Sequence, residues 1–289
     1  MRASLRTLAL TGVAAFTLAP MVEAQITKPP ASPRCKMTQS VGFGEVTVDY
    51  GRPSVRGREV FGSMEAWGVV WRTGANACTT ITLSEDAAIG GESLKAGTYG
   101  LFTIPMEKGD WTLIFSNQTD LWGAGGYDPA KDALRVNVAP TKLSATHETL
   151  TIDFTGFHSN GAELFIAWAD TRLAVPFMVD TDTKVRQQID EKVRNAKGEV
   201  SARSYFDAAM FLIDKEENLE EAAAWMDKAV AKSPGAFWMM YQSAALAHKM
   251  GNNEKAKSVA TKALAAAEAS ERGDFGYGAR IKELLKKLK

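Results

Sequence analysis

The stretch TYGLFTIPMEKGDWTLIFS, residues 98–116, decides the fold class of this chain. It contains two runs rich in aromatic and β-branched residues, TYGLFTIP (98–105) and WTLIFS (111–116), which are typical of strands. A Lys-Gly-Asp turn at 108–110 separates the two runs. The stretch therefore predicts two consecutive strands with no helix between them.

Runs of the same kind recur along the first two thirds of the chain. EVTVDY (45–50) alternates polar and apolar residues at a period of two, as a half-buried strand does. Further runs are TTITLS (79–84), LRVNV (134–138), ETLTIDF (148–154), AELFIAWA (162–169) and RLAVPFMV (172–179). Short strands at this spacing, without an intervening helical pattern, predict an antiparallel β-sandwich or a jelly-roll-like fold. We assign this β-rich domain to residues 25–182.

At about Asp182 the hydrophobic period changes from two to 3.6, which indicates amphipathic helices. Alanine-rich segments of this kind cover 184–196, 202–215, 219–232, 236–250, 254–269 and about 277 to the end of the sequence. Residues also recur 34 positions apart, such as Asn218 with Asn252 and Lys228 with Lys262. This period resembles that of tetratricopeptide repeats, so we expect all-α helical hairpins over residues 183–289.

Two interpretations of the helical hairpins stay open. Their groove is expected to bind a peptide or a partner protein, as helical repeat arrays do. The alternative is a short array that packs on the sandwich or mediates dimerisation, because such repeats need neighbours to stack on.

The first 24 residues have the pattern of a cleavable signal peptide. Arg2 and Arg6 give a basic start, the segment from Leu8 to Met21 is apolar, and a small residue, Ala24, ends a Val-Glu-Ala site. We expect cleavage after Ala24 and a periplasmic or secreted mature protein. No later segment has the apolar length needed to span a membrane.

The chain has two cysteines, Cys35 and Cys78. Both fall in the part expected to be exported, where an oxidising environment favours disulfides. Cys35 and Cys78 are therefore a candidate disulfide pair.

The formal net charge is zero, with a small acidic excess before residue 183 and a small basic excess after it. Neither part has the strongly basic surface that nucleic-acid binding requires, so we expect no nucleic-acid partner. The three histidines, His147, His158 and His248, have no metal-ligand spacing, and the sequence lacks a nucleophile elbow and a phosphate-binding loop. We therefore predict no metal site and no cofactor, and we name no catalytic residue.

Arginines concentrate around two segments that are rich in turn residues. Arg52 and Arg58 lie in the long connection 51–64, and Arg72 and Asn76 lie in the hexapeptide WRTGAN (71–76). A second long connection, 116–132, adds the aromatic residues Trp122 and Tyr127. Arginine suits the recognition of carboxylate or phosphate, and aromatic faces suit sugars, so these six residues form the candidate site for a small anionic or carbohydrate-like ligand. The alternative is that the arginines pair with Asp49, Glu59 or Asp128 and fasten the loops to the sheet.

Several blocks of the sequence resemble a known bacterial family. The blocks include ASPRCKMTQSVGFGEVTVDYGRPSVRGREVFG (31–62), VVWRTGANACTTITLSEDAAIGGESLKAGTYGLFTIP (69–105) and WGAGGYDPAKDALRV (122–136). In this order they resemble the family called domain of unknown function 2911 over residues 31 to 180. The resemblance implies an exported protein with a β-rich domain that is often followed by helical repeats, and it implies no activity and no residue roles.

The features together favour an exported ligand-binding or protein-interaction module. The alternative function is an envelope-associated hydrolase with its site in the loops 51–64, 72–78 and 116–132. Asp49, Asp128 or His158 would then serve as acid or base, although no spacing favours a particular pair.

Overall fold

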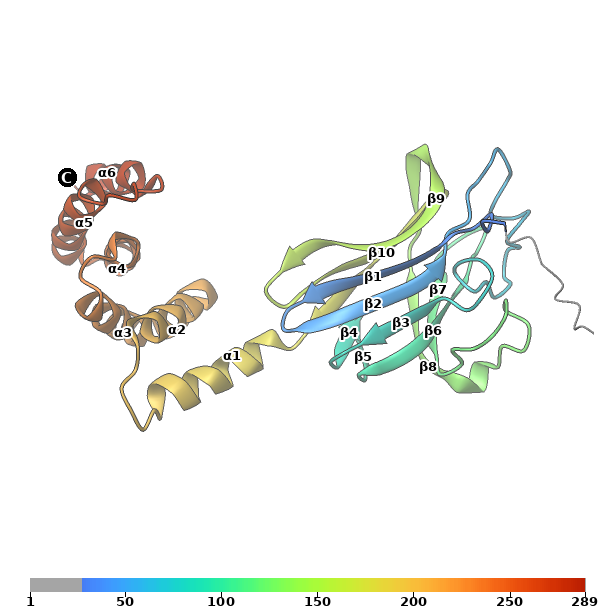
Figure 1. Ribbon diagram of the computed structural model, residues 1–289, viewed down its shortest axis with the longest axis horizontal. Helices are drawn as coiled ribbons and strands as arrows, with labels where there is room; N and C mark the ends of the chain where they lie inside the picture. Colours follow the sequence, from blue (N-terminus) through green and yellow to red (C-terminus); the bar gives the residue numbers. More distant parts are fainter. Residues whose placement is uncertain (1–27, 289) are drawn as a thin grey trace, which may run out of the picture.

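The computed structural model describes residues 28–288, and the predicted signal peptide lies outside them. A β-rich part is followed by a helical part (Figure 1). The strands are β1 (Arg34–Val41), β2 (Gly44–Gly51), β3 (Thr80–Leu83), β4 (Ala87–Ile89), β5 (Glu92–Leu94), β6 (Gly97–Ile104), β7 (Trp111–Ser116), β8 (Asp132–Val138), β9 (Thr141–His158) and β10 (Gly161–Val179).

The strands form two antiparallel sheets, which confirms the predicted sandwich. One sheet has the order β1-β2-β3-β6-β7-β8 and the other has the order β5-β4-β10-β9. The stretch 98–116 forms the hairpin β6–β7, in register from Gly100 opposite Ser116 to Ile104 opposite Thr112. The sequence pattern missed β1, β4 and β5. Strand β1 has only three apolar residues among eight, Cys35, Met37 and Val41 on its inward face, and the other two strands have three residues each.

The main core lies between the two sheets. Alternating residues of the inner faces fill it, including Val48, Ile81, Leu101 and Ile152, all of them fully buried. A smaller cluster lies on the other face of the six-stranded sheet, where Cys78, Phe102 and Ile114 pack against Leu121 and Tyr127. The long connection between β7 and β8 therefore covers a second apolar layer.

Strand β10 turns back on itself, which agrees with the two separate runs predicted at 162–169 and 172–179. Its first residues pair with β9 and its last residues pair with β4. The two ends meet again, because the Val179 N–H donates to the carbonyl of Asn160, at 2.7 Å, and Gly161 lies against Phe177 and Met178. Ala169, with a φ of 53°, is the residue of β10 that has left-handed backbone geometry.

The helices begin directly after β10. They are α1 (Thr181–Ile189), which continues as a π-helical turn (Asp190–Arg194), α2 (Ala202–Lys215), α3 (Leu219–Lys232), α4 (Phe237–Lys249), α5 (Asn253–Glu268) and α6 (Tyr277–Lys287). Helix α2 packs on α3 and α4 packs on α5, so the predicted hairpins are present. Buried alanines such as Ala222, Ala256 and Ala260 allow these close helix contacts. The division into domains after residue 182 stays a prediction.

Helix α1 connects the sandwich with the arc formed by the other helices (Figure 1). Asp180 caps its first turn by accepting from the Thr183 N–H at 3.1 Å. An ion pair of 2.6 Å between Lys184 and Glu85 fastens α1 to the sandwich. On the other side, Lys215 of α2 pairs with Asp182 at 2.5 Å.

The structure argues against the predicted disulfide, because Cys35 and Cys78 are both free thiols. Cys35 lies on β1 and Cys78 lies just before β3, and β2 runs between these two strands. Strands that are second neighbours lie about 9 to 10 Å apart, which is beyond the Cα separation that a disulfide can span. The two side chains also belong to different clusters, since Cys35 contacts the inner core and Cys78 the outer one.

Candidate functional site

A cleft of ≈ 560 Å³ lies at the end of the sandwich that is distant from α1. One wall comes from the connection after β2, from Val55 to Phe61, together with Trp67. The opposite wall comes from the start of β9 and from the bend of β10, and Glu107 of the β6–β7 turn completes the rim. Its volume is within the range of small-molecule pockets, which is about 300 to 1,000 Å³.

The bend of β10 shapes one wall of the cleft. The pairing of β10 with β9 shifts register on both sides of Ala169, and Thr171 then lies opposite Lys142. A left-handed alanine costs about 1 kcal/mol, and the bend turns Ala169, Asp170 and Thr171 toward the cleft. Bulges and strained residues of this kind are frequent beside ligand sites, because they redirect side chains.

An aromatic cluster supports the other wall. The ring of Phe61 lies 4.7 Å from that of Trp111 and 5.9 Å from that of Trp168, both edge-on. Trp67 stacks on Phe61, with ring centroids 6.2 Å apart, and keeps 38% of its surface exposed. Trp71, the first residue of WRTGAN, stacks on Trp168 behind them at 5.6 Å. Trp67 is thus a flat apolar surface that is held in place by buried neighbours.

Charged groups of both signs line the same cleft. Arg58 is fixed by its own loop, since its Nε donates to the carbonyl of Val55 at 2.9 Å and its Nη2 donates to that of Ser54 at 2.6 Å. Lys142 and Asp170 form an exposed ion pair of 3.6 Å on the other wall. Glu59 and Glu107 add two more carboxylates. The cleft therefore offers donors and acceptors side by side.

Of the six candidate residues, Arg58 is the one that lines this cleft. The side chain of Arg52 instead fastens the connection to β9, because its Nε donates to the Leu150 carbonyl and its Nη2 donates to Thr151, both at 2.9 Å. The alternative interpretation, in which arginines fasten the loops, predicts carboxylate partners, but Arg52 and Arg58 use backbone carbonyls and the hydroxyl of Thr151.

Tyr127 also forms internal contacts. Its hydroxyl donates to Asp132 at 2.5 Å and accepts from Arg135 at 2.8 Å. Burial and the hydrogen bond to Asp132 raise the pKa of Tyr127 to about 12. Tyr127 therefore closes the β7–β8 connection and is protonated at neutral pH.

The remaining candidates, Arg72, Asn76 and Trp122, lie together on the outer face of the six-stranded sheet. Ala77 and Trp122 form an isolated β-bridge, and the side-chain amide of Asn76 donates to the carbonyl of Ser32 at 3.3 Å. The Arg72 guanidinium lies against Gly123, and among the described residues its buried Nε has no hydrogen-bond partner. Trp122 is 74% exposed. This group is separate from the cleft.

The hexapeptide WRTGAN itself is a turn that closes onto the sheet. The indole N–H of Trp71 donates to the carbonyl of Gly74 at 3.1 Å. Thr73 and Thr103, both fully buried, share a hydroxyl hydrogen bond of 2.8 Å. Gly74 lies so close to Thr79 that a side chain would not fit there. Trp71, Thr73 and Gly74 thus have structural roles.

The acid and base residues named for a hydrolase lie apart. Asp49 on β2 pairs with Arg34 at 2.6 Å, and Asp128 caps the short 3₁₀ turn Pro129–Lys131. His158 accepts from the backbone of Asn160 at the far end of β9. Within residues 28–288 no group of three metal-ligating side chains comes together.

Sequence reasoning missed most of the cleft. Trp67 and Glu59 lie in or beside the connection that was expected to bind, but Glu107, Lys142 and Asp170 come from three other places in the chain. Asp170 follows the predicted strand 162–169 directly, and this position at the end of a strand is the one signal that could have indicated it.

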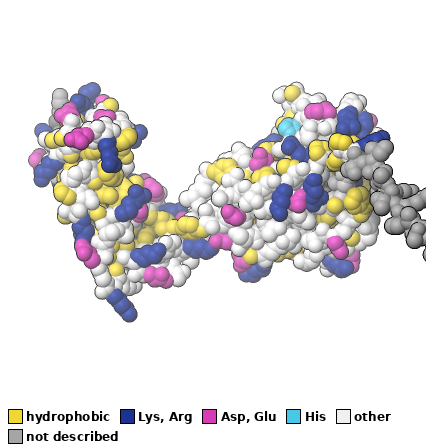
Figure 2. Space-filling view, in the orientation of Figure 1, with side chains coloured by type: hydrophobic (Ala, Val, Ile, Leu, Met, Phe, Trp, Pro, Cys, Tyr) yellow, Lys and Arg dark blue, Asp and Glu magenta, His cyan; other side chains and the backbone are white. Residues whose placement is uncertain are grey.

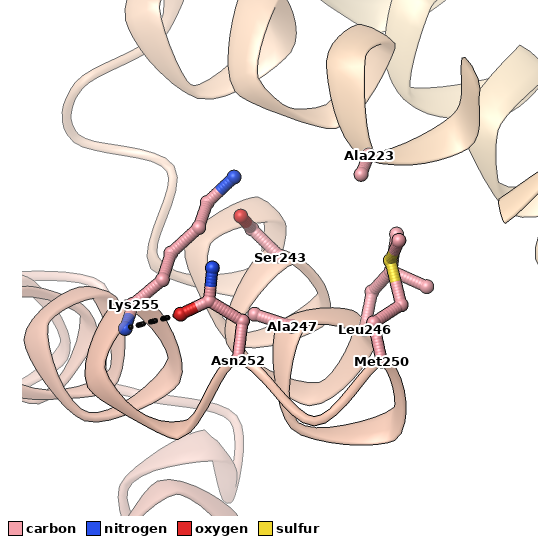
Figure 3. Close-up of a pocket in the computed structure, with 7 residues that line it drawn as sticks. All are labelled: Ala223, Ser243, Leu246, Ala247, Met250, Asn252 and Lys255. Carbon is pink, nitrogen blue, oxygen red and sulfur yellow. Dashed lines mark hydrogen bonds between the residues drawn. The ribbon is translucent and has the colours of Figure 1, made fainter. Parts of the chain in front are cut away.

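The helical part has its own smaller pocket, of ≈ 260 Å³. Figure 3 shows Ala223 of α3 across from Leu246 and Met250, with Asn252 and Lys255 at the rim. Met250 and Trp238 each keep 38% of their surface exposed. Figure 2 shows hydrophobic side chains along the side of the helical arc that faces the sandwich.

A family model described as Protein of unknown function (DUF2911) matches residues 32–177, about half of the chain. No curated protein matches the chain. Among 11 matching solved chains is the crystal structure of PcrH from Pseudomonas aeruginosa, at 16% identity and a TM-score of 0.29, covering 32% of this chain and 67% of that one. A TM-score this low supports no functional comparison. Across residues 28–288, no helix has the length and apolar character needed to cross a membrane.

Proposed function

The chain belongs to the family described as Protein of unknown function (DUF2911), and for it we propose the function of an exported protein that binds a small ligand. The ligand would occupy the cleft between Val55–Phe61 and the bend of β10. The expectation of export comes from the N-terminal sequence, with its basic start and apolar segment.

The observation that supports ligand binding most directly is the cleft itself. It combines a flat exposed aromatic residue, Trp67, with fixed polar groups such as Arg58 and a strained backbone at Ala169. Small-molecule sites have this composition, in which apolar area supplies affinity and a few polar groups give orientation. Binding is favoured over hydrolysis because none of Asp49, Asp128 and His158 lines the cleft, and each of them has a structural contact elsewhere.

A ligand screen on the mature full chain tests this proposal. We expect a compound from a library of polar metabolites to raise the melting temperature and to change the tryptophan fluorescence. Trp67→Ala should abolish both responses. Trp122→Ala is the matched control, because Trp122 is an exposed tryptophan outside the cleft. If every hit binds Trp67→Ala as well as it binds the unchanged protein, the cleft is not the ligand site.

Export is tested separately in a bacterial host. The complete chain should appear in the periplasmic or secreted fraction with a new N-terminus at Gln25. A variant that lacks residues 2–24 should remain in the cytoplasm. Cytoplasmic retention of the complete chain would contradict export while leaving ligand binding untouched.

The helical part supports a second role, the binding of a partner protein. Trp238 and Met250 are large hydrophobic residues that remain partly exposed, and aromatic and methionine residues are enriched at protein interfaces. A double Trp238→Ser, Met250→Ser variant should lose any partner that copurifies from the native host. Retention of the partner by this variant would exclude these two residues as contacts.

A further inference from the structure

The charges of the cleft limit the class of ligand that it can accept. Arg58 and Lys142 would repel a cationic ligand, and Glu59, Glu107 and Asp170 would repel an anionic one. Either ligand would bring its charge close to groups of the same sign within one cleft. The two cations and three carboxylates nearly cancel, so the cleft offers little net attraction to an ion of either sign and favours a ligand without a net charge.

A hydroxyl group matches this arrangement. It carries one donor and two acceptor sites, so it is satisfied by a cationic N–H on one side and a carboxylate oxygen on the other. The pair Lys142 and Asp170, 3.6 Å apart, offers these two partners on one wall. On the other wall the cleft is lined by Arg58, which can donate, and by Glu59, which can accept. A ligand with several hydroxyls could therefore use both walls.

The aromatic residue adds the third requirement, a flat apolar surface. Trp67 is held by Phe61 and by Trp111, whose rings lie 6.2 and 6.0 Å from it, so little side-chain entropy remains to be lost on binding. The C–H groups on one face of a pyranose ring form a flat apolar patch, which suits contact with an indole ring. A polyol without a ring would lack this patch.

Resting on the proposed function, we infer that the cleft binds an uncharged saccharide of one or two rings. One ring packs on Trp67, and its hydroxyls bind between the pair Arg58 and Glu59 and the pair Lys142 and Asp170. The volume of ≈ 560 Å³ provides room for more than one ring.

Isothermal titration calorimetry on the mature full chain tests the ligand class. The probes are glucose, galactose, mannose, N-acetylglucosamine and their common disaccharides, each compared with glucuronate, galacturonate and glucosamine as charged counterparts. We expect at least one uncharged saccharide to bind, and we expect its charged counterparts to bind with at least tenfold lower affinity. Trp67→Ala should weaken the binding at least tenfold, whereas Trp122→Ala should leave it unchanged.

A charge-neutral variant, Asp170→Asn, gives a second measurement. It should weaken the binding of the uncharged saccharide, because a carboxylate acceptor is lost. It should strengthen the binding of glucuronate, because a repelling carboxylate is removed. The inference is overturned if a charged compound binds more tightly than every uncharged saccharide, or if no saccharide binds while another compound of the metabolite screen does. In both of these results the proposed binding function survives. If neither a saccharide nor any compound of the metabolite screen binds, the proposed binding function is overturned as well.

Discussion

The hydroxyl of Tyr50 lies between the two sheets and bonds both backbone groups of Ile152. It accepts from the Ile152 N–H at 3.0 Å and donates to the Ile152 carbonyl at 3.4 Å. Tyr50 is 1% exposed, and burial raises its pKa above the usual value. The Tyr50 hydroxyl on β2 thus provides the hydrogen-bond partner for the N–H and the carbonyl of Ile152 on the edge strand β9, which would otherwise be buried without a partner.

Tyr50→Phe should destabilise the sandwich, because it leaves the Ile152 N–H and carbonyl buried without a partner. The expected loss is about 1 to 3 kcal/mol in the free energy of unfolding, measured by urea denaturation. Tyr99→Phe is the control, since the hydroxyl of Tyr99 donates to the single carbonyl of Lys95. The control should lose about 1 kcal/mol or less. Equal losses in the two variants would contradict the sheet-bridging role of Tyr50.

The contact between Tyr50 and Ile152 shows which part of the fold local pattern can predict. The alternation in EVTVDY places Tyr50 on the inner face of a strand, as the structure confirms. The identity of its partner depends on the packing of two sheets, and the pair is separated by 102 positions. Strands and helices were therefore predictable, whereas contacts between sheets were not.

The same limit explains why the sequence did not show which candidate residues line the cleft and which fasten the loops. Arginine-rich connections were predicted to bind a ligand, but the sequence does not show whether a guanidinium reaches a backbone carbonyl. Arg52 does so through the carbonyl of Leu150, and this contact depends on where β9 lies. The cleft depends in turn on the bend at Ala169, a residue type that rarely adopts a left-handed conformation and so gives no signal of a turn.

Glu65 should make stability depend on pH. Burial raises the pKa of Glu65 from its usual value of 4.5 to about 7, and the nearby Arg72 lowers it only in part. The folded state therefore holds a proton that the unfolded state has released between these two pH values. The free energy of unfolding should fall as pH rises from 4.5 to 7, by about 1 to 2 kcal/mol, because solvent screening reduces the effect of a carboxyl that is only partly buried. Glu65→Gln should flatten this slope, as urea denaturation at several pH values would show; an unchanged slope would assign it to other groups.

The two thiols should both be free in the mature protein. Titration of denatured, unreduced protein is expected to find Cys35 and Cys78 reactive. In the native protein Cys78 should react slowly at pH 8, because burial raises the pKa of its thiol to about 11 and keeps it protonated. A Cys78→Ala variant shows how much of the measured thiol reactivity comes from Cys78. Recovery of a peptide that links Cys35 to Cys78 by a disulfide would refute the separation of the two strands.

Gly123→Ala should destabilise the β7–β8 connection through Arg72. Gly123 has a φ of +85°, and a methyl group there would fall 2.8 Å from Nη1 of Arg72. Gly126→Ala is the matched control, with a φ of +82° and its nearest neighbour at 3.8 Å. Both variants bear the backbone cost, about 1 kcal/mol, and Gly123→Ala should lose about 1 kcal/mol more through the clash. Equal melting temperatures would show that the guanidinium of Arg72 moves away freely.

The bend of β10 should be strained by the side chain of Ala169. Ala169→Gly relieves a left-handed alanine, which gains about 1 kcal/mol, but it also raises the entropy of the unfolded chain. These effects oppose each other, so the free energy of unfolding should be unchanged or slightly higher. Ala167→Gly, at a residue of the same strand that pairs with Thr151 and has no positive φ, has no strain to relieve and loses buried contact, so it should lose about 1 kcal/mol or more. Urea denaturation of both variants separates the two cases, and an equal loss in both would mean that the left-handed backbone at Ala169 stores no strain beside the cleft.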